Sequence, residues 1–232
     1  MPNHVLAAAL RNVPAATVQP SAAERVAAVL REQIVDGALR SGTRLTEETI
    51  GTALGFSRNT IREAFALLLA ERLAVREPNR GVFVATPTAA DVRDLYATRR
   101  LVEPAAVEHG PAFSDDVVRR LRSVVDAGHA ALGRGDAAGV AQANQEFHRA
   151  LARISGSRHV DQLMEGVLAE MRLVFHQVAD DAGFHEPYLE RNEAIVELLE
   201  RCDRPGAAAL LRDYLEDAEA HLVRAVRGTG VG

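Results

Sequence analysis

The sequence has no lysine, no tryptophan, one cysteine and few aromatic residues. Aromatic residues make up only 4% of the chain and apolar residues 47%, which favours helices packed through alanine, leucine and valine over an aromatic-rich β-sandwich. The single cysteine, Cys202, excludes an intramolecular disulfide framework and a cysteine-only zinc site, and is typical of a reducing compartment. We therefore expect a mainly helical protein without structural disulfides.

Long apolar runs are also missing. No segment approaches the roughly twenty uncharged apolar residues that a membrane-spanning helix needs. The short apolar run at residues 5–10 has no basic residue before it, so it does not resemble an export signal. We expect a cytoplasmic protein with no membrane partner, in which residues 1–20 form a flexible tail.

The charges are spread unevenly along the 232 residues, a length that suits two domains. The net charge of −5 argues at first against a nucleic-acid partner. However, residues 21–86 carry nine arginines against eight acidic residues, whereas residues 87–232 carry seventeen against twenty-four. A basic face is therefore expected in the first third of the chain.

Capping and turn signals in residues 21–85 predict a winged helix-turn-helix. Three helices are expected, each with a serine or threonine N-cap: Ser21 for residues 21–36, Thr46 for a helix that Gly55 ends, and Ser57 for residues 57–71. Residues 73–77 and 82–84 then read as two short strands of a hairpin. This order of elements indicates DNA binding.

The third helix has the residues that base reading requires at its N-terminus. In a helix-turn-helix this end of the second helix lies nearest the base edges. Arg58 and Arg62 share one helix face, and either side chain can bind guanine with two hydrogen bonds. Ser57, Asn59 and Thr60 offer hydrogen bonds to bases or phosphates. The alternative is that the two arginines form an ordinary solvated face.

Two further arginines extend this candidate surface. Arg80 lies at the predicted hairpin tip, from which it can reach a minor groove or the DNA backbone, and Arg44 can hold a phosphate. With Gly81, which follows Arg80, they complete the predicted DNA-binding set.

Residues 25–84 resemble the DNA-binding domain of the GntR family of bacterial regulators. The resemblance rests on four segments: Gly42-Thr43-Arg44-Leu45, Leu54-Gly55-Phe56-Ser57-Arg58, Ile61-Arg62-Glu63-Ala64 and Arg80-Gly81. It implies that Arg58 and Arg62 are the principal DNA contacts. Asn59-Thr60 stands where many members have Thr-Pro, a departure that affects operator preference rather than the fold.

Beyond a short linker at residues 86–88, no strand pattern appears. An all-helical domain is expected over residues 89–227, with helices at about 89–109, 115–132, 137–154, 158–179, 188–201 and 205–227. Thr88 and Asp91 form a predicted capping box for the first of them. The fold class is thus mainly α, a winged helix-turn-helix followed by a bundle of about six helices.

Residues 89–225 resemble the FCD effector domain of the FadR subgroup, through residues 94–99, Glu103, Phe147-His148 and the helix pair around 192–215. The resemblance implies a metal site with one aspartate and three histidines in many members. Here Asn144, Asn192 and Tyr214 replace three of these ligands, and His148 alone is kept. Amides and a phenol are poor ligands for a transition metal, so we expect no metal cofactor. A different set of metal ligands that includes His176 or His185 stays open as an alternative.

Four polar residues are predicted to lie inside the bundle: Asn144, His148, Asn192 and Tyr214. Burying them is costly unless they bond each other, water or a ligand. We predict that they line an effector site. Arg99 matches an arginine that the resemblance implies is an effector contact, and it can bind a carboxylate with two hydrogen bonds. The expected effector is a small carboxylate or an acyl-CoA. Alternatively, Arg99 forms a salt bridge with Glu103, and His148 is a satisfied core residue.

These interpretations predict a transcriptional regulator, and more specifically a repressor. A homodimer is expected to read pseudo-palindromic double-stranded DNA, and an effector to alter its geometry through the linker. The main alternative is a metabolite-binding or enzymatic bundle with the winged helix as an interaction module. No nucleophile with a base and no paired acids at a suitable spacing support an enzyme. A further alternative is an architectural DNA-binding protein without an effector, in which the four buried polar residues would have no role.

Overall fold

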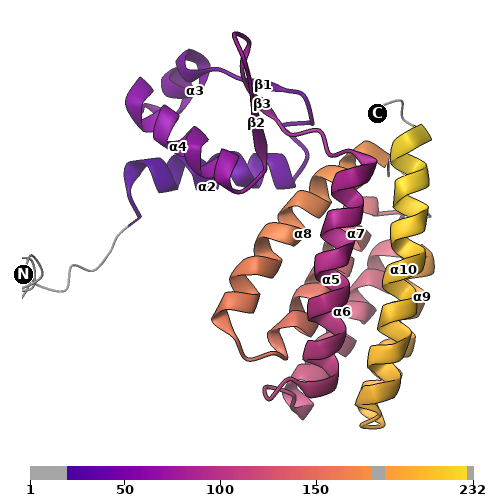
Figure 1. Cartoon of the computed structure of the whole chain (residues 1–232). Coiled ribbons are helices and arrows are strands. Elements are labelled where there is room, and N and C mark those ends of the chain that lie inside the picture. Colours follow the sequence, from indigo (N-terminus) through magenta and orange to yellow (C-terminus); the bar gives the residue numbers. More distant parts are fainter. Residues whose placement is uncertain (1–19, 179–185, 229–232) are drawn as a thin grey trace, which may run out of the picture.

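The computed structural model describes residues 20–178 and 186–228, and the predicted tail lies almost wholly outside them. Two domains follow one another along the chain (Figure 1). The first contains α2 (Ala22–Val35), β1 (Arg44–Leu45), α3 (Glu47–Leu54), α4 (Arg58–Ala70), β2 (Ala74–Glu77) and β3 (Gly81–Val84). The second contains α5 (Ala89–His109), α6 (Asp115–Gly133), α7 (Ala137–Arg153), α8 (Arg158–Val178), α9 (Glu186–Glu200) and α10 (Arg204–Gly228).

Local signals begin and end the helices of the first domain. Ser21 forms a capping box with Glu24, and the Ser57 side chain accepts a hydrogen bond from the backbone N–H of Thr60. Gly55, at a φ of 73°, ends α3 in the left-handed conformation that glycine adopts without strain. Thr46 is the N-cap residue of α3, as predicted, but its hydroxyl donates to Thr49 Oγ1 at 2.7 Å and makes no capping hydrogen bond.

The wing contains the predicted hairpin of β2 and β3, and β1 adds a third antiparallel strand in the order β1-β3-β2. The extra strand β1 pairs Arg44 with Phe83 and Leu45 with Val82. A strand of two residues is too short for an alternation of polar and apolar side chains to be recognised, so the sequence pattern does not reveal it. Its pairing holds Arg44 against the wing.

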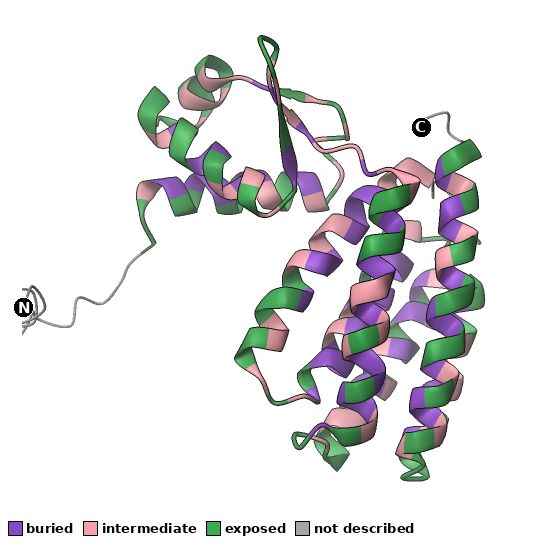
Figure 2. Cartoon of the chain, viewed as in Figure 1, coloured by how far each residue is buried: buried purple, intermediate pink, exposed green. Residues whose placement is uncertain are grey.

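Each domain has its own hydrophobic core (Figure 2). In the first, Ile61 and Leu68 on the buried face of α4 pack against Ile34 of α2 and Val84 of β3. In the second, α5 lies beside α10 and α6 beside α7, and Phe147 is fully buried among them. The opposite side of α4 faces solvent.

The two domains meet where the ends of α2 and α8 come together (Figure 1). Leu173 of α8 is buried in the core of the first domain. Arg172 donates from Nε to the carbonyl oxygen of Val35 at 3.0 Å, and His176 donates from Nε2 to the same oxygen at 2.8 Å. Gly37 has a φ of 82°, and a Cβ atom there would lie 2.8 Å from the His176 ring. We call Arg172, Leu173 and His176 the α8 contact.

Candidate DNA-binding face and buried polar cluster

The N-terminal turn of α4 presents the predicted base-reading residues to solvent. Ser57, Arg58 and Asn59 are exposed, and the Arg62 side chain is 62% exposed one turn further along. The opposite face of α4 is buried, which fixes the side that the arginines occupy. The two arginines and the exposed amide N–H groups of the first turn thus lie at one end of α4.

Several side chains of this face are paired with one another. The Ser57 and Thr60 hydroxyls lie 2.9 Å apart, and Asn59 Nδ2 donates to Glu63 at 2.8 Å. Arg62 donates from Nε to Glu47 Oε1 at 2.7 Å, which joins α4 to the first turn of α3. Sequence reasoning missed this partner, because the pair joins two helices and not neighbouring turns of one helix.

The other predicted contacts gather beside α4. A hollow of about 400 Å³ is lined by residues of β1, α3, α4 and the wing, among them Arg44, Arg58 and Gly81. Arg76 of β2 is exposed and lines the same hollow, and sequence reasoning missed it. Arg80 is exposed at the hairpin tip, where it pairs with Glu77.

Inside the helical domain, the predicted effector residues form a hydrogen-bonded network around Glu103. Glu103 accepts from Arg99 Nε at 2.8 Å, and its second oxygen lies 2.6 Å from His148 Nδ1. His148 Nε2 lies 2.9 Å from the Tyr214 hydroxyl. Asn144 Oδ1 accepts from Asn192 Nδ2 at 2.9 Å and lies 3.2 Å from the Tyr214 hydroxyl. All six side chains are buried, and we call them the polar cluster.

The environment fixes the charges of the polar cluster. Burial opposes ionisation of Glu103, but Arg99 and His148 outweigh it and lower its pKa. Burial and the positive charge of Arg99 lower the pKa of His148, against the pull of Glu103. A neutral His148 then donates from Nδ1 to Glu103. Its Nε2 and Asn144 Oδ1 are two acceptors for the one hydroxyl proton of Tyr214, at 2.9 and 3.2 Å. Burial raises the pKa of Tyr214. Arg99 and Glu103 are the charged pair of the cluster.

Family models match both domains. Residues 22–84 match the bacterial regulatory proteins of the gntR family, and residues 94–217 match the FCD domain. The chain belongs to the GntR family. It is 30% identical over 224 residues to the HTH-type transcriptional regulator BphR of Paraburkholderia xenovorans, covering 89% of this chain and 86% of BphR. It is 25% identical over 204 residues to the gluconate operon transcriptional repressor of Bacillus licheniformis, covering 84% and 82%.

Solved structures agree with this assignment. A GntR-type transcriptional regulator from Rhodococcus sp. RHA1 is 45% identical and superimposes with a TM-score of 0.81, over 88% of this chain and 98% of that one. McbR/YncC of E. coli shares the fold at a TM-score of 0.75 and 20% identity, over 89% and 99%. This GntR protein is therefore a DNA-binding transcriptional regulator with a metabolite-binding FCD domain, and not an enzyme. Among its described helices, none is long and apolar enough to cross a membrane.

The polar cluster of this GntR regulator does not fit the metal of other FCD domains. Asn144 Oδ1 already accepts from Asn192, and both ring nitrogens of His148 are engaged. Over residues 20–178 and 186–228, no three histidine, cysteine or acidic side chains are grouped so that they could hold a metal ion. Of the two other histidines considered, His176 bonds Val35 and His185 lies outside the described residues.

Two buried atoms of the polar cluster lack a hydrogen-bond partner among the described residues: Arg99 Nη2 and Asn192 Oδ1. Such atoms are costly unless water or a ligand satisfies them. A hollow of about 380 Å³ reaches Tyr214 from the surface between α9 and α10, and Arg191, His221 and Arg224 also line it. Asp217 lines it as well and pairs with Arg191 at 2.5 Å, so the two arginines outnumber the one carboxylate at this opening beside the cluster.

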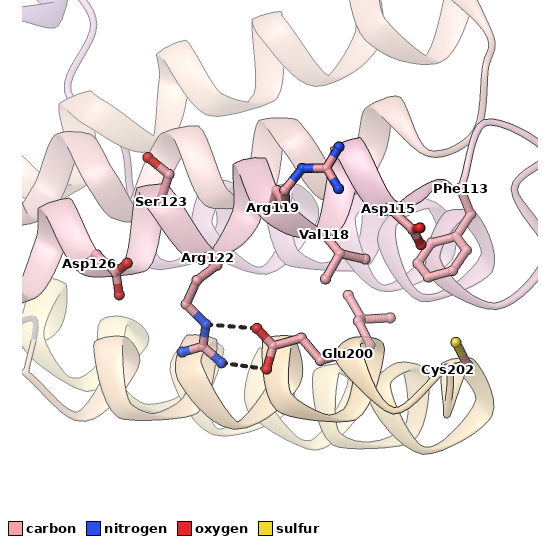
Figure 3. Close-up of a pocket in the computed structure, with 10 residues that line it drawn as sticks. Phe113, Asp115, Val118, Arg119, Arg122, Ser123, Asp126, Glu200 and Cys202 are labelled. Carbon is pink, nitrogen blue, oxygen red and sulfur yellow. Dashed lines mark hydrogen bonds and ion pairs between the residues drawn. The ribbon is translucent and has the colours of Figure 1, made fainter.

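A second hollow, of about 480 Å³, lies between α6 and the end of α9 (Figure 3). Arg122 crosses it and donates to both oxygens of Glu200 at 2.9 Å, and the exposed Cys202 lies at its edge. None of the polar-cluster residues lines it. This hollow is not the predicted effector site.

Proposed function

We propose that this protein is a cytoplasmic repressor that binds a pseudo-palindromic operator as a homodimer. Arg58 and Arg62 read bases in the major groove, and Ser57, Asn59 and Thr60 add bonds to bases or phosphates. Arg44, Arg80 and Gly81 hold the DNA backbone or an adjacent minor groove. The observation that carries this proposal is the exposed N-terminal turn of α4 with Arg44, Arg58 and Gly81 around one hollow.

The alternative effector is a bulkier acyl-CoA, whose acyl group is a thioester and whose anionic groups are phosphates. The effector we propose is a small metabolite with a carboxylate. Its carboxylate enters between α9 and α10 and is attracted by Arg191 and Arg224. Arg99 Nη2 offers a buried donor, and Asn192 Oδ1 offers an acceptor for a hydroxyl or N–H group of the ligand. Asn144, His148 and Tyr214 complete the effector-binding set.

The signal passes to the DNA-binding domain through the α8 contact as well as through the linker at residues 86–88. Gln145, next to Asn144 on α7, donates to the carbonyl oxygen of Leu168 on α8 at 2.8 Å. Five residues further along α8, Leu173 enters the core of the winged helix. An effector that shifts α7 against α8 thus changes the orientation of the DNA-binding domain. It regulates only if it binds the two orientations with different affinity.

A thermal-shift screen of small carboxylates and acyl-CoA thioesters tests the effector proposal. A ligand of the native state raises the melting temperature. We expect a hit to stabilise the wild-type protein, to lose affinity in Arg224→Gln, and to keep it in Arg201→Gln, whose side chain is exposed away from the opening. The same hit should change the rate at which a selected operator is released. Hits that bind both variants equally would contradict the proposed site.

A further inference from the structure

Glu47 is the acidic partner of a predicted base-reading arginine. Its Oε1 atom accepts from Arg62 Nε at 2.7 Å across the two helices of the helix-turn-helix. The hydrogen bond from Arg62, together with the positive charges of Arg58 and Arg76, lowers the pKa of Glu47. The carboxylate is therefore ionised at neutral pH, in the middle of a face where three arginines gather.

The atom that Glu47 engages decides which end of Arg62 remains for DNA. A guanidinium group has five N–H donors, and Glu47 takes the one on Nε. The other four lie on Nη1 and Nη2, at the tip of the side chain, and two of them can reach O6 and N7 of one guanine. Glu47 thus fixes the plane of Arg62 and leaves its tip available for base contact.

The charge of Glu47 acts against binding that relies on phosphates alone. Non-specific DNA affinity comes almost entirely from arginine and lysine charges neutralising phosphates. An acidic group between Arg58, Arg62 and Arg76 lowers the positive potential of this face for every DNA sequence. A guanine placed at the tip of Arg62 restores the lost affinity only at the right sequence. Such a penalty against competing partners raises specificity.

We propose that Glu47 is a specificity-determining positioning residue for operator recognition. It orients Arg62 through the Nε bond and weakens binding to other DNA, and it does not itself read a base. This inference rests on the proposed contact between Arg62 and DNA. The adjacent Glu48 provides a matched control, because it has the same charge in the same helical turn and is exposed.

The experiment compares E47Q, E48Q, R62A and the double variant E47Q/R62A as full-length proteins. The wild-type protein first selects its preferred duplex from random DNA. Fluorescence anisotropy then gives each protein's affinity for that duplex and for a scrambled duplex of equal length, at one salt concentration. Circular dichroism melting confirms that each variant is folded.

We expect E47Q to bind scrambled DNA more tightly and to lose roughly tenfold in the ratio of operator to scrambled affinity, within the range of one oriented guanine contact. E48Q should tighten both affinities alike and leave the ratio unchanged. In the R62A background, E47Q should not lower the ratio further, because the arginine that it orients is gone.

Two results would overturn the inference while leaving the proposed function intact. If E47Q and E48Q behave alike, Glu47 contributes only charge. If E47Q tightens operator binding more than scrambled binding, Glu47 withholds Arg62 from DNA and is inhibitory. By contrast, if R62A keeps the wild-type ratio, the proposed Arg62 contact fails and the role of Glu47 fails with it.

Discussion

His148 Nδ1 on α7 lies 2.6 Å from Glu103 Oε2 on α5, and both side chains are almost fully buried. Sequence reasoning named Glu103 as part of the FCD resemblance and as a possible salt-bridge partner of Arg99, but not as a partner of His148. In the structure Glu103 binds both residues, Arg99 through Oε1 and His148 through Oε2. One buried carboxylate thereby connects the arginine of the predicted effector site to the histidine, and through it to Tyr214.

The buried histidine predicts a pH dependence of stability. Folding lowers the pKa of His148 through burial and Arg99, so below about pH 6.5 the unfolded chain binds a proton that the folded protein resists. The free energy of unfolding should fall as the pH drops from 6.5 towards 5, by up to about 1.4 kcal/mol per unit for this one proton. Protonation of Glu103 adds a further loss only below about pH 4.5, because its pKa is also lowered.

Urea unfolding at several pH values measures this slope. His148→Gln should flatten the slope between pH 6.5 and 5, whereas His159→Gln, at an exposed position of α8, should leave it as in the wild type. The lowered pKa values of His176 and His221 contribute to the wild-type slope in the same direction and remain in both variants. Equal slopes in His148→Gln and the wild type would contradict the neutral, buried state of His148.

Restoring the family's metal ligands should restore metal binding. Glu103 holds His148 at Nδ1, which directs Nε2 towards Tyr214, the arrangement of a metal-binding histidine supported by a carboxylate. The triple variant N144D/N192H/Y214H supplies one aspartate and three histidines, a set that suits Zn²⁺. We expect about one zinc per chain by elemental analysis after dialysis, and far less in the wild type. Adding His148→Ala to the triple variant removes one of the four ligands and should weaken zinc binding markedly.

Stoichiometric zinc in the wild-type protein would contradict our interpretation of Asn144, Asn192 and Tyr214. A zinc affinity in the quadruple variant equal to that of the triple variant would instead place the metal away from His148.

The α8 contact should control the coupling between the domains. His176→Ala removes a partly buried hydrogen bond to Val35, which is worth about 0.5–1.5 kcal/mol. Gly37→Ala should have a larger effect, because it places a methyl group against the His176 ring at a φ of 82°. Hydrogen exchange should show faster exchange near the end of α2 in both variants, and no change in the exposed control His159→Ala. Unchanged exchange in all three would mean that the α8 contact does not hold the domains together.

Local chemistry made much of the fold predictable. The caps at Ser21, Ser57 and Thr88 and the end of α3 at Gly55 depend on residues within four positions, and all are found. Thr46 also takes the N-cap position of α3, but its hydroxyl donates to Thr49 Oγ1 and makes no capping hydrogen bond with the backbone.

Non-local contacts were out of reach of pattern reasoning. Strand β1 exists because of its pairing with β3, about forty residues later in the chain. The bond between Arg172 and Val35 joins residues 137 positions apart, and the Arg62–Glu47 pair crosses two helices. The resemblance to a known family brought Asn144, His148, Asn192 and Tyr214 together. Their actual hydrogen bonds, and the place of Glu103 among them, depend on how the helices pack in three dimensions and cannot be read from the sequence.

The most direct test of the account is the affinity of Arg58→Ala and Arg62→Ala for the duplex that the full-length wild-type protein selects from random DNA, measured against scrambled DNA. Arg119→Ala provides the control, because this arginine is also exposed but lies on α6 in the helical domain. We predict that Arg58→Ala and Arg62→Ala each lower the ratio of selected to scrambled affinity roughly tenfold or more, and that Arg119→Ala leaves this ratio unchanged. If all three variants discriminate as the wild type does, α4 does not read the operator and the central claim is wrong.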